Sequence, residues 1–269
     1  MSTTDSTATA PARSATGSVS TWVRFRAPVP SPHLRLLCFP HAGGGASAYR
    51  AWPGLMPEGV EACPVQLPAR ESRMGDPLPA TLDELVREAA EALMPLLDVP
   101  FALVGTSFGS LLAYELAHRL RGTHGFGPSA LVVSSEWAPS EHHRERATGV
   151  PALSDEAFLA ELRQGQVLPA SVLDDPDLLA LALPPLRGDS ALSAAFRHRR
   201  REPLDCPVWA FHGAHDPRVS TADMEPWGEE TTAGFRLHEV DSAHLVLDAS
   251  EAEVVPALVA DLLAEGLLA

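Results

Sequence analysis

The sequence predicts an α/β fold in which a mostly parallel sheet is covered by helices on both faces. Short apolar runs typical of strands alternate with segments of helical periodicity over residues 34–137 and again over residues 207–267. The intervening residues 138–203 contain no strand-like run. The chain has 269 residues, of which 45% are hydrophobic, which is enough to bury one core of this kind.

The expected strands are short and apolar, and they cover residues 34–39, 61–67, 101–104, 129–135, 207–213 and 235–240. Helical periodicity is clearest over residues 81–97, where apolar side chains share one face and Thr81 is a suitable N-cap. Further helices are expected from residue 107 to about residue 120, near 221–230, and from 251 to about 267.

Residues 138–203 are expected to form a helical insertion over one end of the sheet. Short helical segments are predicted at 155–164, 176–183 and 189–200, separated by glycine and proline. The α/β core therefore comprises residues 22–137 and 204–269. Residues 1–21 are rich in Ser, Thr and Ala and lack the apolar region of a signal peptide, so a disordered N-terminal tail is predicted.

Composition narrows the function classes. The net charge of −15 argues against nucleic acid as the main partner. No run of 18 apolar residues is present, so no membrane span is predicted. Cys38, Cys63 and Cys206 form no CxxC pair and are interpreted as buried thiols of a cytoplasmic protein.

The segment "LVGTSFGS", residues 103–110, places one serine between two glycines where an expected strand meets an expected helix. This is the pattern of a nucleophile elbow, a sharp turn that lifts the Ser107 hydroxyl above the sheet edge. Residues without side chains relieve the crowding at such a turn. The N-terminus of the following helix directs amide hydrogens at an oxyanion formed there.

A serine nucleophile needs a base, and the base needs an orienting acid. In folds with this elbow the acid and then the base follow the serine along the chain. Asp216 follows the strand "PVWAFHG", and His244 follows the next strand, so both are expected at the same sheet edge as Ser107.

Two other histidines and a metal site are weaker candidates. His212 lies within an apolar strand and is interpreted as packed, and His215 follows too closely on its own strand. No third or fourth ligand lies near these two histidines, so a metal site is not predicted. The loop "FPHAGGG", residues 39–45, follows the first long strand, where this fold places the second oxyanion amide.

The chain resembles the type II thioesterases, which are stand-alone α/β-hydrolases of polyketide and nonribosomal peptide assembly lines. The resemblance covers about residues 34–260, and it rests on "FPHAGGGASAY…W", "VQLPARESR", "LVGTSFGSLLAYELA", "LPPLRGDSAL", "CPVWAFHGAHDPRV" and "AHLVL". It implies that Ser107 is the nucleophile, Asp216 the orienting acid and His244 the base. It also implies an oxyanion hole formed by the backbone amides of Ala42 and Phe108, and a helical lid at residues 138–203.

The sequence departs from the family pattern at several positions. Thr106 replaces the histidine usually found before the nucleophile, and Ala69 replaces the glycine of the usual P-G-R motif. The segment before the base lacks the usual glycines, and the segment after it lacks the usual aromatic residues. "GQVLPASVL", residues 165–173, lacks a second glycine expected in the lid. These departures point to a variant acyl specificity.

The implied function is hydrolysis of acyl thioesters from the phosphopantetheine arm of an acyl or peptidyl carrier protein, without a cofactor, by a monomeric enzyme. Two alternatives stay open. A serine esterase or an acyl cyclase would use the same triad, and a non-catalytic member would bind carrier proteins only.

Two sets of residues are predicted to contact the substrate and its carrier. The apolar side chains of Phe158, Leu162 and Leu168 are expected to contact the acyl group. The run "RHRRR", residues 197–201, is either a solvated helix end or a docking patch for an acidic carrier protein. The docking interpretation involves Arg197, Arg199, Arg200 and Arg201.

Overall fold

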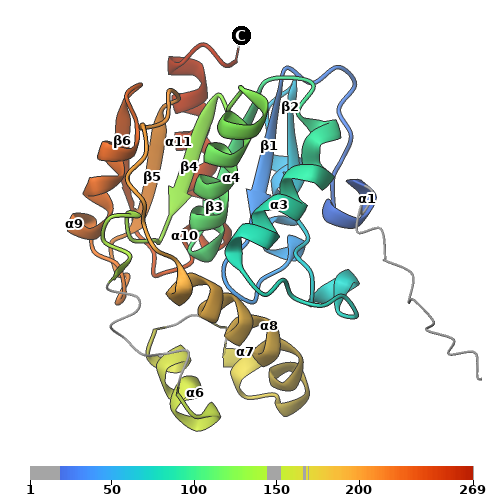
Figure 1. The fold of residues 1–269 in the computed structure, drawn as a ribbon, viewed down its shortest axis with the longest axis vertical. Helices are drawn as coiled ribbons and strands as arrows, with labels where there is room; N and C mark the ends of the chain where they lie inside the picture. Colours follow the sequence, from blue (N-terminus) through green and yellow to red (C-terminus); the bar gives the residue numbers. More distant parts are fainter. Residues whose placement is uncertain (1–18, 144–152, 166–167, 169, 269) are drawn as a thin grey trace, which may run out of the picture.

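The computed structural model contains a six-stranded parallel sheet in the order β2-β1-β3-β4-β5-β6 (Figure 1). It describes residues 19–143, 153–165, 168 and 170–268. Every expected strand is present, with bounds β1 Leu34–Phe39, β2 Val60–Pro64, β3 Phe101–Thr106, β4 Ala130–Ser134, β5 Val208–Gly213 and β6 Phe235–Val240. Since β1 to β5 are buried along their whole length, their near-continuous apolar runs are those of a sheet covered on both faces.

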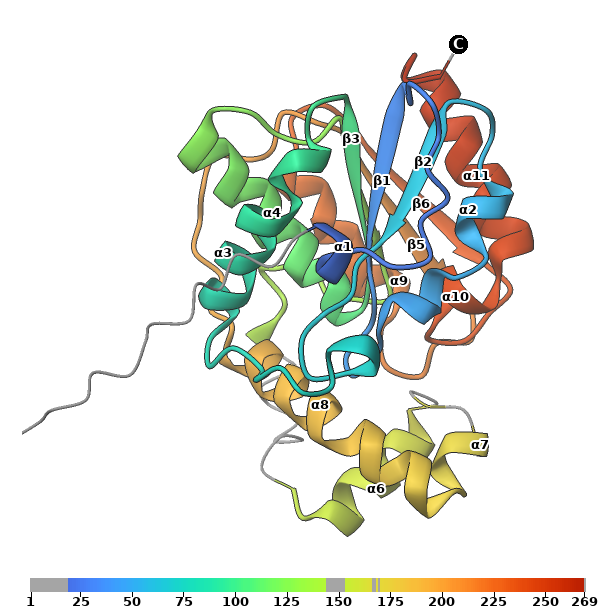
Figure 2. The same ribbon diagram turned by 90° about the vertical axis from the view of Figure 1, so that its right-hand side faces the viewer.

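Helices cover both faces of the sheet, as predicted (Figure 2). Helices α3 (Leu82–Leu93) and α4 (Phe108–His124) lie on one face, where the larger hydrophobic core is found. Helices α2 (Trp52–Leu55), α10 (Val246–Ala249) and α11 (Glu251–Ala264) lie on the other face. The Thr81 hydroxyl accepts a hydrogen bond of 3.2 Å from the Glu84 amide, so the predicted N-cap starts α3.

Three further helices lie beyond the carboxyl ends of the strands (Figures 1 and 2). They are α6 (Asp155–Gln164), α7 (Ala170–Leu173) and α8 (Pro176–Ala195). A small cluster formed by Phe158, Leu162, Leu173 and Leu186 holds them together. These helices occupy the region expected for a lid, although residues 144–152, 166–167 and 169 of the predicted insertion lie outside the described part of the chain.

The prediction of two separate helices at 176–183 and 189–200 is wrong. A single helix, α8, runs through Pro184, Pro185 and Gly188. Its buried face, which includes Leu186 and Leu192, packs against the rest of the molecule and offsets the backbone hydrogen bonds lost at the prolines. Gly188 has a packing role, because a Cβ there would lie 2.1 Å from Leu78 Cδ2.

The predicted tail boundary at residue 21 falls too late, and residues 1–18 of that tail lie outside the described residues. Helix α1 (Val19–Trp22) ends in the buried indole of Trp22, and the Arg73 guanidinium lies 4.4 Å from its ring centroid. The Gln66 amide donates a 2.7 Å hydrogen bond to the Trp22 carbonyl. Burial of the Trp22 indole agrees with a core that starts at residue 22, and α1 extends the ordered chain back to Val19.

The described helices and the three cysteines can be compared with the predictions from composition. None of the helices they form has the length and apolar character needed to cross a bilayer. Cys38, Cys63 and Cys206 are buried free thiols, as predicted. Burial raises the pKa of Cys63 and of Cys206 to about 12, so these thiols stay protonated and unreactive at neutral pH.

Candidate active site

Ser107 occupies the sharp turn between β3 and α4. Its backbone has φ 51° and ψ −124°, a conformation that is strained for a residue with a side chain. The Ser107 amide donates a 2.7 Å hydrogen bond to the Ser134 carbonyl, and the Ser110 amide donates one of the same length to the Ser107 carbonyl. These bonds to β4 and to the first turn of α4 hold the strained turn in place.

The two glycines around Ser107 are required by close backbone approach. A Cβ on Gly105 would lie 2.3 Å from the Gly109 carbonyl oxygen. A Cβ on Gly109 would lie 2.2 Å from the Phe39 carbonyl oxygen at the end of β1. The G-x-S-x-G spacing therefore lets α4 begin directly against the sheet, with the serine at the apex of the turn.

Asp216 and His244 come from the loops after β5 and β6, and they meet as predicted. Asp216 Oδ2 lies 2.8 Å from His244 Nδ1, and the two side chains are 0% and 4% exposed. The other carboxylate oxygen of Asp216 accepts hydrogen bonds from the Arg218 amide at 2.8 Å and the Val219 amide at 3.2 Å. The carboxylate is thereby fixed in one orientation against the imidazole.

The electrostatics of this pair favour an ionised acid. Burial raises the pKa of Asp216, but the hydrogen bonds from His244 and from the amides of Arg218 and Val219 outweigh burial and lower the pKa below its ordinary value. An ionised Asp216 holds the proton of His244 on Nδ1. It leaves Nε2 as the basic nitrogen, which is the tautomer required of a general base.

The other histidines of this region have different surroundings. His212 is buried, and its Nε2 lies 2.9 Å from the Val219 carbonyl oxygen, so it is a packed side chain as interpreted from the sequence. The His215 side chain is 71% exposed and pairs with Asp241 at 2.8 Å. Over residues 19–143, 153–165, 168 and 170–268, no group of three or more His, Cys, Asp or Glu side chains is placed to hold a metal ion.

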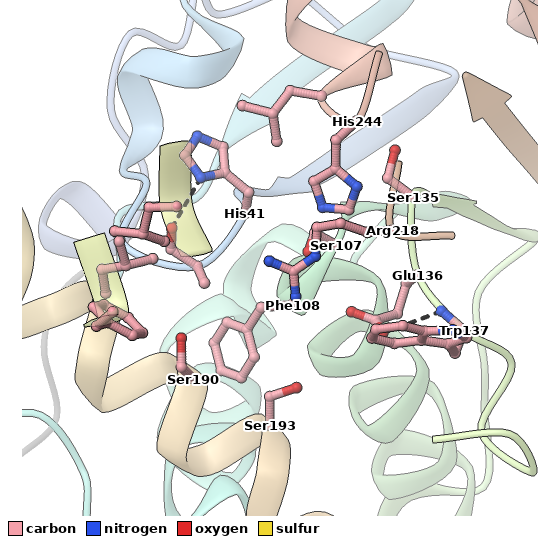
Figure 3. A pocket seen from close by; sticks show the side chains of 15 residues that line it. His41, Ser107, Phe108, Ser135, Glu136, Trp137, Ser190, Ser193, Arg218 and His244 are labelled. Atoms are coloured by element: carbon pink, nitrogen blue, oxygen red, sulfur yellow. Dashed lines mark hydrogen bonds between the residues drawn. The ribbon is translucent and has the colours of Figure 1, made fainter. Parts of the chain in front are cut away.

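Ser107 and His244 line one pocket together with Ala42 and Phe108 (Figure 3). Phe108 is the first residue of α4, where a backbone amide has no carbonyl partner within its own helix. Ala42 belongs to the turn after β1, which a 2.9 Å hydrogen bond from the Gly44 amide to the His41 carbonyl closes. Both predicted oxyanion donors therefore lie at the pocket that contains the serine.

Helices α6 and α8 of the predicted lid region supply the other wall of this pocket. Phe158 and Leu162 of α6, for which contact with the acyl group stays a prediction, line it together with Leu186 of α8. Leu168 packs against the same lid cluster but is not among the residues that line the pocket.

Polar pocket residues missed by sequence analysis are His41, Ser135, Glu136, Ser190, Ser193 and Arg218 (Figure 3). Ser135 and Glu136 directly follow β4, a position at the carboxyl edge that a sequence reading can flag. Ser190 and Ser193 face the pocket because α8 crosses it, and the sequence carries no signal for that crossing.

The four arginines of the predicted docking run have different surroundings. Arg201 forms an ion pair with Glu115 and lies 5.0 Å from the Tyr114 ring centroid, so its guanidinium already has partners within the fold. Arg197 donates hydrogen bonds to the carbonyls of Ala194 and Phe196 at the end of α8. Arg199 and Arg200 are exposed, and neither forms an ion pair within the described residues.

Two departures from the family pattern have structural explanations. The Thr106 hydroxyl lies 2.7 Å from the hydroxyl of Tyr49, which donates a 3.1 Å hydrogen bond to the Phe39 carbonyl. Thr106 thus joins a buried network below the elbow in place of the usual histidine. Ala69 has φ 69°, the left-handed conformation that explains why glycine is usual at this position.

The sequence and the fold were compared with those of known proteins. The thioesterase domain family matches residues 34–263. The type II thioesterase BorB from the borrelidin biosynthetic cluster has a TM-score of 0.79 and 32% identity, over 91% of this chain and 98% of that one. The parallel sheet matches such neighbours, and with the serine elbow of this chain at its carboxyl edge it defines an α/β-hydrolase.

Proteins with similar sequences identify the family to which this chain belongs. Gramicidin S biosynthesis protein GrsT of Aneurinibacillus migulanus is 37% identical over 223 residues, which are 82% of this chain and 86% of that protein. AMB antimetabolite synthetase AmbE of Pseudomonas aeruginosa is 41% identical over 224 residues, but the match spans only 10% of that protein's length. The chain belongs to the thioesterase family, and it is a thioester hydrolase.

Proposed function

We propose that this protein hydrolyses acyl thioesters on the phosphopantetheine arm of acyl or peptidyl carrier proteins through a covalent Ser107 intermediate. The observation that carries the proposal is the buried Asp216–His244 pair at the same pocket as the strained Ser107. Relatives from polyketide and nonribosomal peptide pathways, such as BorB and GrsT, support a carrier-bound substrate and a role in antibiotic biosynthesis.

In the first half of the reaction, His244 Nε2 accepts the proton of the Ser107 hydroxyl while Oγ attacks the thioester carbonyl carbon. The carbonyl oxygen becomes an oxyanion that accepts hydrogen bonds from the amides of Ala42 and Phe108. Collapse of the tetrahedral intermediate breaks the C–S bond. His244 returns the proton to the pantetheine sulfur, and the acyl group stays on Ser107.

In the second half, a water molecule replaces the thiol. His244 removes one proton from water, the hydroxide attacks the ester carbonyl, and the same amides stabilise the second oxyanion. Collapse returns the proton to Ser107 Oγ and releases the free acid. Asp216 stays ionised throughout and stabilises the imidazolium form of His244. No step of this reaction requires a cofactor.

The acyl chain is accommodated between the sheet edge and the lid. Phe158, Leu162 and Leu186 present apolar atoms on the lid side of the pocket, while the polar groups of Ser190 and Ser193 lie farther along α8. This surface suits an acyl group with an apolar body.

A panel of acyl-carrier thioesters, varied in chain length and α-branching, tests the proposal with the wild type and Ser107→Ala. We expect free acid as product and a loss of turnover on the order of 10⁶ in the variant, with the fold intact by circular dichroism. A fluorophosphonate should label the wild type at Ser107 only. Ester or ring products would indicate the alternative acyl-transfer chemistries. A variant that keeps one tenth of the activity would exclude Ser107 as the nucleophile.

A further inference from the structure

Asp189 is a buried acid on the lid helix α8 that the proposed mechanism does not use. Its side chain is 0% exposed. Buried carboxylates are costly unless they are paired and hydrogen-bonded. Asp189 meets this requirement with contacts to two separate segments of the α/β core.

The first contact is with Arg70, in the loop after β2. The Arg70 side chain is 4% exposed and forms an ion pair with Asp189, with a second hydrogen bond of 3.0 Å from Nη2 to Oδ1. Arg70 Nε donates a 2.8 Å hydrogen bond to the Pro68 carbonyl, so the guanidinium is fixed to its own loop. This two-bond geometry positions the carboxylate as well as neutralising it.

The second contact is with the loop that carries the proposed oxyanion donor. The Gly43 amide donates a 2.8 Å hydrogen bond to Asp189 Oδ2. Gly43 directly follows Ala42 and has φ 73°, and a Cβ there would lie 2.9 Å from Leu186 Cβ on α8. The lid helix therefore packs directly against the turn at residues 42–44, and glycine is required at that contact.

We infer that Asp189 is a positioning residue, which orients the Ala42 amide toward the substrate by holding the adjacent Gly43 amide. The inference rests on the proposed function, in which Ala42 donates to the oxyanion. Other bonds of this loop, such as that from the Gly44 amide to the His41 carbonyl, stay within the core, but the Gly43 amide has its acceptor on α8. The orientation of the oxyanion loop at residues 42–44 is therefore coupled to the docking of α8 on the core.

Two double variants separate this role from simple charge neutralisation. Arg70→Gln with Asp189→Asn removes both charges but keeps a side-chain oxygen that accepts from Gly43. Arg70→Met with Asp189→Leu also removes both charges, and it leaves Gly43 without an acceptor. Each replaces a buried ion pair by groups of similar size, a change that folded proteins often tolerate. Asp189→Ala with Arg70→Met serves in place of the Leu variant if overpacking prevents folding.

Three measurements on the two double variants test whether Asp189 positions the oxyanion loop. The first measurement is turnover of an N-acetylcysteamine thioester. We expect kcat of Arg70→Met with Asp189→Leu to be about 10- to 100-fold lower than kcat of Arg70→Gln with Asp189→Asn, with KM little changed. Labelling of Ser107 by a fluorophosphonate should slow similarly, because its phosphoryl oxygen occupies the oxyanion site. Hydrogen exchange of the peptide containing residues 42–45 should be faster only in the variant without an acceptor.

Arg187→Gln is the matched control for general loosening of the lid. Arg187 lies two residues from Asp189 on α8, where its guanidinium pairs with the exposed Asp155 of α6 at 2.7 Å and lies 4.3 Å from the Phe158 ring centroid. We expect its kcat to stay close to the wild-type value. Equal kcat and equal labelling rates in the two double variants would overturn the inference. Absence of thioester turnover in the wild type would contradict the proposed function instead, and the labelling rates would still test Asp189.

Discussion

His244 is held by Asp216 through a 2.8 Å contact between Nδ1 and Oδ2, and both side chains are almost completely buried. His215 has the same kind of contact with Asp241, also at 2.8 Å, but with both side chains more than two-thirds exposed. Of these two histidines, only His244 lines the pocket that contains Ser107. An exposed pair is screened by water and contributes little, whereas burial fixes the orientation of the imidazole.

This contrast predicts opposite outcomes for two histidine variants. His244→Ala should lower kcat by roughly 10⁶, because a triad acts as a unit. His215→Ala should leave kcat within about twofold of the wild type, because surface ion pairs contribute little. Steady-state kinetics on one small thioester compares them directly. The reverse ranking would identify His215 as the base.

Asp216→Asn should have a large but smaller effect. An amide in place of the carboxylate can stabilise the wrong tautomer of His244, and it removes the negative charge opposite the imidazolium. We expect kcat to fall by about 10⁴. Turnover that is unchanged in this variant would show that another group orients the base.

Docking of an acidic carrier protein is best tested at Arg199 and Arg200, because the guanidinium groups of Arg201 and Arg197 already have partners within the fold. The chain carries a net charge of −15, so an acidic carrier protein needs a local basic surface to approach it. Reversing both arginines to Glu should raise KM for carrier-bound substrate several-fold and leave the N-acetylcysteamine thioester unaffected. Added salt should weaken only the carrier reaction of the wild type. Equal changes with both substrates would indicate a disturbed lid.

The lowered pKa of Glu61 should make the free energy of unfolding depend on pH in the acidic range. Burial raises the pKa of this carboxyl, but hydrogen bonds from Arg26 and Arg35 and from the Val29 amide outweigh burial and lower it. The ionised Glu61 therefore stabilises the folded chain above its unfolded pKa of about 4.3, and this stabilisation is lost as the pH falls through the lower folded-state pKa.

Glu61→Gln tests this dependence. Chemical denaturation of the variant should show a free energy of unfolding about 3 kcal/mol lower at pH 7, because Arg35 loses a buried partner. Below pH 4.3 the difference from the wild type should shrink steadily. A difference that stays constant down to pH 2 would contradict the assignment.

Ala69 offers a stabilising substitution. A φ of 69° costs a residue with a Cβ about 1 kcal/mol or more. This strain is somewhat larger than the free-energy cost of ordering the more flexible glycine backbone on folding. Ala69→Gly should therefore raise the free energy of unfolding by about 0.5 kcal/mol. Ala260→Gly, at an exposed position inside α11, is the control and should lower it by about 1 kcal/mol. Destabilisation by both changes would exclude strain at Ala69.

The positions of the strands along the chain, the elbow at Ser107 and the candidate residues Asp216 and His244 could be predicted from the sequence, whereas the order of the strands in the sheet was not predicted. Strand residues such as those of β3 are apolar along their whole length, and a parallel sheet brings all loops after its strands to one edge. That single topological rule placed Asp216 and His244 with Ser107, although 109 and 137 residues separate them from it along the chain (216 − 107 and 244 − 107).

Only the tertiary structure decided how the lid is built and what it touches. Local propensity predicts breaks at Pro184, Pro185 and Gly188, yet long-range packing keeps α8 continuous across them. The contacts of Asp189 with Arg70 and Gly43 span 119 and 146 residues of sequence. Hydrogen bonds and packing between residues so distant leave no periodicity in the sequence, because each partner looks locally like an ordinary surface acid, loop arginine or turn glycine.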